Sequence, residues 1–174
     1  MQGADFLLAT ASVCVALAGF TGIVAVAGRR GSGDWSHADI LRFWQMIEVS
    51  MLGLLFALLP FLFYHLSVPG PYLWAASSAM LALASGIQML RAAARTLRAF
   101  RSDPSTSLIF TGTYVLIGTV VILALIANAA GMVYPQAVGP YLVGIYWQVC
   151  LAAVLFWRLM KFSGLPYRPP ASGS

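Results

Sequence analysis

Charged side chains are scarce in this sequence of 174 residues: only 9% are Asp, Glu, Lys or Arg, whereas 60% are hydrophobic. Because a water-soluble domain carries about 25% charged residues, this composition excludes an ordinary soluble protein. The apolar residues also come in runs that are too long to be core elements of a soluble fold. We therefore predict an all-α integral membrane protein, a bundle of transmembrane helices packed against one another in a lipid bilayer.

Cysteine and histidine are rare as well, with two residues of each kind. Cys14 and Cys150 fall within apolar stretches, and there is neither a Cys-x-x-Cys pair nor a His-Cys cluster at metal spacing. We interpret both cysteines as small apolar packing residues. His37 and His65 are expected on opposite sides of the membrane, where they could not hold one haem iron. The sequence thus predicts no metal and no cofactor.

Known catalytic patterns are missing too. The sequence has no Ser-His-Asp set expected at one membrane depth, no Gly-rich phosphate loop, no zinc-protease helix and no pair of carboxylates. It also shows no soluble domain that would carry a basic, aromatic surface for nucleic acid. We therefore predict neither an enzyme nor a nucleic-acid-binding protein.

Five stretches are long enough to cross a hydrocarbon core of about 30 Å, which takes roughly 20 helical residues. The predicted spans are about 6–27, 43–65, 72–90 with a helical extension to 100, 108–130 and 141–160. The first lacks the early Lys or Arg of a secretory signal, so we expect it to be retained. Residues 1–162 thus form one five-span domain, and we expect the tail 163–174, rich in Pro, Ser and Gly, to be flexible.

The Lys and Arg residues predict the orientation of the bundle, because five spans place all ten of them on one side of the membrane. These residues are Arg29, Arg30, Arg42, Arg91, Arg95, Arg98, Arg101, Arg158, Lys161 and Arg168. By the positive-inside rule, the N-terminus is outside and the C-terminus is cytoplasmic. We expect a multi-pass protein of the cytoplasmic (inner) membrane.

Two local features bear on helix packing. Pro60 should bend or end the second span, unless a neighbouring helix satisfies the backbone carbonyl that proline leaves without a donor. Small residues at fourfold spacing predict that the first and third spans pack closely, or that one of these seams is a homo-oligomer interface. They are Ala18 and Gly22, with Ser12 and Ala16 before them, and Ser78, Ala82 and Gly86.

Glu48 is the only acidic residue inside an apolar span, where a carboxylate costs about 2.5 to 3.5 kcal/mol on insertion scales. The simplest interpretation is an ion pair with Arg91, which can reach inward from the boundary. A second is a polar cavity that binds a cation or a proton, and a third is a shallow carboxylate that reaches water. The candidate cavity or ion-pair residues are Glu48, Gln45, Gln88, Arg91, Thr111 and Tyr114.

Two further groups are candidate contact sites. Gln148 lies deep in the fifth span and needs a partner, either on another helix or as part of a lipophilic-ligand pocket with Tyr146 and Trp147. At the cytoplasmic boundary, four arginines predict contact with anionic lipid head groups. They are Arg91, Arg95, Arg98 and Arg101.

Our leading interpretation is an inner-membrane protein of structural, scaffolding or complex-partner type with a basic cytoplasmic face. It would act as a homo-oligomer or with a partner membrane subunit. The alternative is a small oligomeric ion or proton-coupled transporter or channel that uses Glu48. A third interpretation is a binder of a lipophilic ligand.

Overall fold

The computed structural model describes residues 3–31, 37–102, 108–132 and 138–163, and within them the chain forms helices and no strand. The helices are α1 (Ala4–Gly31), α2 (His37–His65), α3 (Gly70–Ser102), α4 (Leu108–Ala129) and α5 (Gly139–Ser163). Each contains a stretch long and apolar enough to cross a membrane, which confirms the predicted all-helical fold with five such helices. The predicted flexible tail lies almost wholly outside the described residues.

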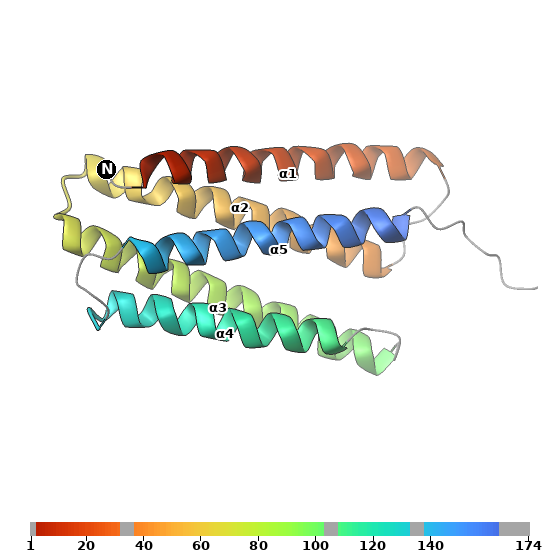
Figure 1. The fold of residues 1–174 in the computed structure, drawn as a ribbon. Coiled ribbons are helices and arrows are strands. Elements are labelled where there is room, and N and C mark those ends of the chain that lie inside the picture. The colour runs from red at the N-terminus through yellow and green to blue at the C-terminus, as the bar shows by residue number, and fades with distance from the viewer. Residues whose placement is uncertain (1–2, 32–36, 103–107, 133–137, 164–174) are drawn as a thin grey trace, which may run out of the picture.

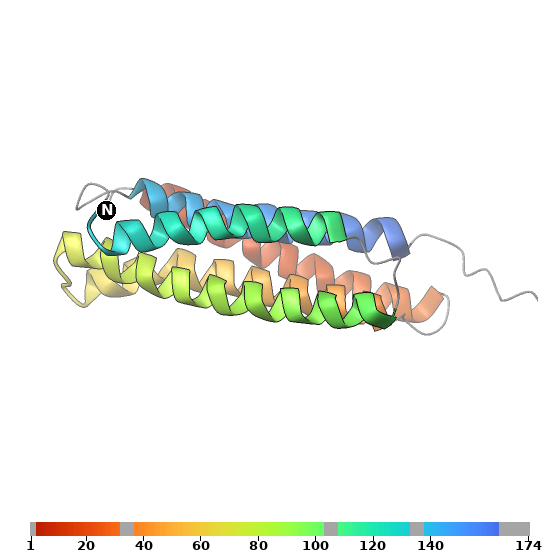
Figure 2. The ribbon, with the colours of Figure 1, turned by 90° about the horizontal axis from the view of Figure 1, so that it is seen from below.

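The helices run side by side along one direction, and the start of α1 and the end of α5 lie at opposite ends of the bundle (Figures 1 and 2). At one end α1, α3 and α5 finish and α2 and α4 begin, and the Lys and Arg residues of the described helices lie toward it. We call this the basic end. Its residues are Arg29, Arg30, Arg42, Arg91, Arg95, Arg98, Arg101, Arg158 and Lys161.

The last helix of the chain is the centre of the bundle. α5 contacts each of the other four helices, whereas α1 contacts only α2 and α5 among the described segments. The pairs α1–α2 and α3–α4 form two antiparallel hairpins, and α5 packs against both (Figures 1 and 2). Each helix contributes at least one deeply buried side chain to a shared apolar core, in which packing contacts hold the helices together. These include Leu7, Phe56, Leu81, Leu125 and Ile145.

Neighbouring helices approach closely at glycines of α2 and α5. A methyl group at Gly144 would lie 2.9 Å from Cδ2 of Leu81 and 3.0 Å from Cδ1 of Leu125, so α5 fits against α3 and α4 only without a side chain there. A methyl group at Gly53 of α2 would lie 2.7 Å from Sγ of Cys14 on α1. Even an alanine at either position would force its neighbours to shift.

The small residues that we predicted to mark the tightest seams do so only in part. Ser78 and Ala82 of α3 are buried, but no neighbouring side chain among the described residues lies within 4 Å of the place where a methyl group would stand at Gly22 or Gly86. Our prediction of close packing is therefore wrong at these two glycines. The physical reason is the rotation of the helices, which leaves Gly22 exposed and Gly86 only half-buried and which fourfold spacing does not encode.

The helix α2 continues through Pro60 to His65, and a neighbouring helix explains why. Proline lacks an amide hydrogen, so the carbonyl of Phe56, four residues earlier, has no donor within α2. The hydroxyl of Tyr141, a fully buried residue of α5, donates to this carbonyl. The ring of Tyr141 also packs against Trp74 of α3, with 5.7 Å between ring centroids. Tyr141 thus supplies the donor that the Phe56 carbonyl lacks, which explains why α2 is not broken at Pro60.

Candidate functional site

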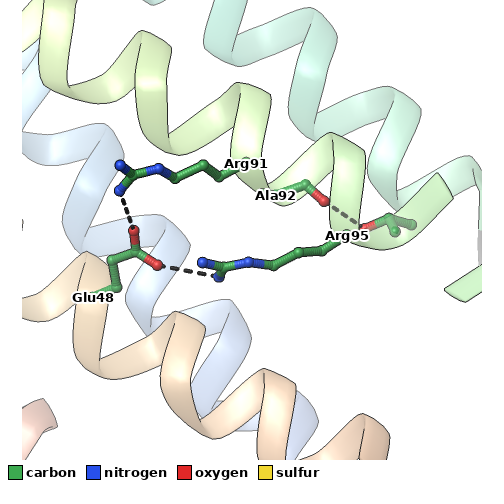
Figure 3. A network of polar contacts seen from close by, with 5 residues as sticks. Glu48, Arg91, Ala92 and Arg95 are labelled. Atoms are coloured by element: carbon green, nitrogen blue, oxygen red, sulfur yellow. Dashed lines mark hydrogen bonds and ion pairs between the residues drawn. The ribbon is translucent and has the colours of Figure 1, made fainter. Parts of the chain in front are cut away.

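The charged contacts between α2 and α3 converge on one carboxylate near the basic end (Figure 3). Nη1 of Arg95 donates to Oε2 of Glu48 at 3.3 Å, and Nη1 of Arg91 lies 3.8 Å from Oε1 of the same residue. The two arginines are four residues apart, so they stand one helical turn from each other on one face of α3. Glu48 therefore bridges two guanidinium groups.

The two ion pairs differ in how open they are. The Arg95 and Glu48 side chains are 36% and 31% exposed, whereas Arg91 is 63% exposed. Arg98, one turn further along α3, is exposed as well. Glu48 supplies one negative charge against the three positive charges of Arg91, Arg95 and Arg98. These four residues together therefore carry a net positive charge. Arg91 and Arg98 are the most exposed of the three arginines.

Arg95 is the last member of a stripe of polar residues that follows one face of α3 through the bundle. Ser78, Ser85 and Gln88 are buried, and Arg95 is half-buried. The spacings of seven, three and seven residues keep the four side chains on one helix face, over about 26 Å of helix length. We call these residues the α3 polar stripe.

The α3 polar stripe joins α3 to three other helices. Nδ2 of Asn128 on α4 donates to Oγ of Ser78 at 2.9 Å, and Nε2 of Gln148 on α5 donates to Oγ of Ser85 at 2.8 Å. The third connection is the ion pair between Arg95 and Glu48 of α2. Polar contacts between helices in lipid favour one arrangement of neighbours over others, because a misplaced helix would leave these groups unpaired.

Of the residues predicted to surround Glu48, the structure brings Arg91 to the carboxylate. Gln88 is buried on α3, and Gln45 and Thr111 are half-buried on α2 and α4. The ring of Tyr114 on α4 stacks on Trp147 of α5, with 6.2 Å between ring centroids and 13° between the planes. Arg101 lies on the last turn of α3, and its side chain is outside the described part of the structure.

The predicted ligand-pocket residues of α5 point in different directions. Tyr146 is exposed, Trp147 is half-buried against Tyr114, and Gln148 is buried beside Ser85. Successive residues of a helix differ by about 100° in direction, so three consecutive side chains do not share one face. The structure therefore does not gather this trio around one volume.

Several contacts of the site differ from those predicted from the sequence. We placed Arg95 among the lipid contacts, although its spacing of four residues from Arg91 is the signal that a carboxylate reaching one arginine meets both. The sevenfold spacing of Ser78 and Ser85 could also have indicated a polar helix face. No signal in the sequence pointed from Tyr141 to the carbonyl of Phe56.

Comparisons with known protein families, curated proteins and solved structures gave no match for this chain. Within the described residues, no group of three or more His, Cys, Asp or Glu side chains is placed to hold a metal ion. Five apolar helices of spanning length are compatible with a multi-pass membrane protein. The chemistry available where Arg91 and Arg95 meet Glu48 is charge pairing (Figure 3).

Proposed function

We propose that the chain is a multi-pass protein of the cytoplasmic membrane with a structural or complex-partner role, and that its basic end faces the cytoplasm and binds anionic lipid head groups. The observation that carries the proposal is the unequal charge balance around Glu48, which holds Arg95 closely and leaves Arg91 and Arg98 exposed. Each arginine near an anionic membrane surface contributes about 1 kcal/mol to binding.

Arg91 and Arg98 have the position and the chemistry for phosphate. They are seven residues, or two turns, apart on one face of α3, and both belong to its apolar, span-length segment Tyr72–Arg98. Arginine at such a boundary extends its guanidinium toward the head groups and donates two parallel hydrogen bonds to a phosphate. Arg95 is the structural member of the three, because Glu48 already accepts its hydrogen bond.

The interior of the bundle supports a structural role over transport through it. Proton transfer across a membrane requires polar groups that form a chain of hydrogen bonds. Leu81 lies between Ser78 and Ser85 on α3 and is fully buried. It packs beside Gly144 of α5, as does Leu125 of α4. This apolar layer separates the two polar contacts, so the described interior favours a closed bundle.

Lipid preference in reconstituted samples tests the proposal. We expect the wild-type protein in mixed phosphatidylglycerol and phosphatidylcholine nanodiscs to retain the anionic lipid, as read by native mass spectrometry. Arg91→Ala and Arg98→Ala should each weaken this preference about fivefold, the equivalent of about 1 kcal/mol. Leu97→Ala, at an exposed neighbouring position, is the matched control and should change nothing.

Two outcomes would contradict the proposal. One is an undiminished preference for anionic lipid in the Arg91→Ala, Arg98→Ala double variant. The other is a proton or cation flux in vesicles that Glu48→Gln abolishes, which would establish the transporter alternative in its place.

A further inference from the structure

The side chain of Gln148 is only half satisfied at the centre of the bundle. It is 2% exposed and belongs to α5, the helix that contacts all four others. Its Nε2 donates to Ser85, but its Oε1 has no hydrogen-bond partner among the described residues. Turning the carboxamide over would exchange the two ends and leave the nitrogen unpaired instead. One end of this amide therefore requires a further partner, because an unpaired polar group is costly in an apolar interior.

A second unpaired polar group lies on the adjacent helix. Ser50 of α2 is fully buried, and its Oγ has no hydrogen-bond partner within the described part of the chain. Gly53, three residues along the same face, packs on α5, where a methyl group at Gly53 would lie 3.7 Å from Cβ of Gln148. Val49, next to Ser50, clusters with Leu151 of α5. These contacts place Ser50 within about one helical turn of Gln148.

We propose that Gln148 Oε1 and Ser50 Oγ together bind a water molecule between α2 and α5. The water donates one hydrogen bond to the carboxamide oxygen and forms a second hydrogen bond with the serine hydroxyl. The ligand is this small because α2 packs closely on both α1 and α5 here: a methyl group at Gly53 would lie 2.7 Å from Sγ of Cys14 and 3.7 Å from Cβ of Gln148. Buried waters in proteins occupy such places, where they complete the hydrogen bonds of otherwise unpaired polar groups.

Buried apolar residues enclose the proposed site along the bundle. Toward the basic end, Met46 and Val49 of α2 cluster with Leu151 and Leu155 of α5. Toward the other end, Leu81 of α3 is fully buried. The water is therefore separated from the exposed arginines, and this site does not depend on lipid binding by them.

Water-edited solid-state NMR of the full chain in lipid vesicles tests the site. Magnetisation that starts on water should reach the carboxamide of Gln148 at mixing times at which the methyl groups of Leu81 and Leu125, both fully buried, show no transfer. The two leucines are the internal reference for a dry interior. Transfer to Gln148 that is as slow as transfer to these leucines would overturn the proposal, and this measurement needs no variant.

Substitutions then test the role of Ser50. Ser50→Ala should lower the transfer from water to Gln148 by about half, because the water loses one of its two partners. Ser12→Ala is the matched control, since the exposed Ser12 hydroxyl bonds to its own helix at Leu8 O over 3.0 Å, and should leave the signal unchanged. Undiminished transfer to Gln148 in Ser50→Ala would contradict a site shared by the two residues.

Discussion

In the middle of α3, Ser78 and Ser85 meet Asn128 and Gln148 as neutral, buried pairs, whereas at the basic end Arg95 meets Glu48 as a charged, partly exposed pair. The neutral pairs hold uncharged groups away from solvent, so salt does not screen them. The charged pair lies where water and ions reach it. One helix thus uses polar contacts for assembly in its middle and keeps accessible charge at its end.

Burial explains why the two regions differ in the contacts that they can make. A neutral hydrogen bond in the interior is satisfied by its protein partner and leaves no charge for a ligand. At the basic end, one carboxylate among three arginines leaves positive charge on exposed side chains, which an anionic ligand can neutralise. The carboxamide of Gln148 lies between these two cases, because its Oε1 is buried and has no hydrogen-bond partner among the described residues.

The largest effect should come from the buried region, at the hydroxyl of Tyr141. Tyr141→Phe removes the donor to the Phe56 carbonyl, which Pro60 leaves without a helical partner. We expect a loss of about 1 to 3 kcal/mol in the free energy of unfolding, the cost of a buried unpaired polar group. Unfolding in detergent micelles measures it, with the exposed Tyr72→Phe as control. Equal stability of both variants would show that α2 tolerates the free carbonyl.

An intermediate effect is expected for the pair of Gln148 and Ser85. A double-mutant cycle of Gln148→Met and Ser85→Ala should give a coupling energy of about 0.6 kcal/mol and at most about 1.7 kcal/mol, the range for hydrogen bonds between membrane helices. The same unfolding measurement at low and high salt should give the same coupling. Additive single effects would mean that the 2.8 Å contact contributes nothing to assembly.

The smallest effect should come from the charged pair. Glu48→Gln keeps the shape of the side chain and removes its charge, and we expect a loss of about 0.5 kcal/mol or less at low salt, because partly exposed ion pairs are weak. This loss should disappear at high salt, in contrast to the effect of Gln148→Met. A salt-independent loss would show that the Glu48 pair behaves like the buried contacts and would remove the distinction between the two regions.

The sequence was sufficient to predict five apolar helices, because runs of about twenty apolar residues have few alternatives. It also indicated that Lys and Arg gather at one end and that Arg91 is near enough to pair with Glu48, since both follow from helix length and chain order. The contact of Arg95 with Glu48 could have been predicted in the same way, because Arg95 lies one turn from Arg91. The orientation of the bundle in the membrane stays a prediction.

Only the tertiary structure decided which faces of the helices meet. That α5 is the central helix, that Gly53 and Gly144 rather than Gly22 and Gly86 allow close approach, and that Tyr141 compensates for Pro60 all depend on helix order and rotation. In a soluble protein, the alternation of polar and apolar faces would indicate that rotation. In an apolar bundle, the outward and inward faces are both hydrophobic, so the sequence determined the helices and their ends, and packing alone determined their neighbours.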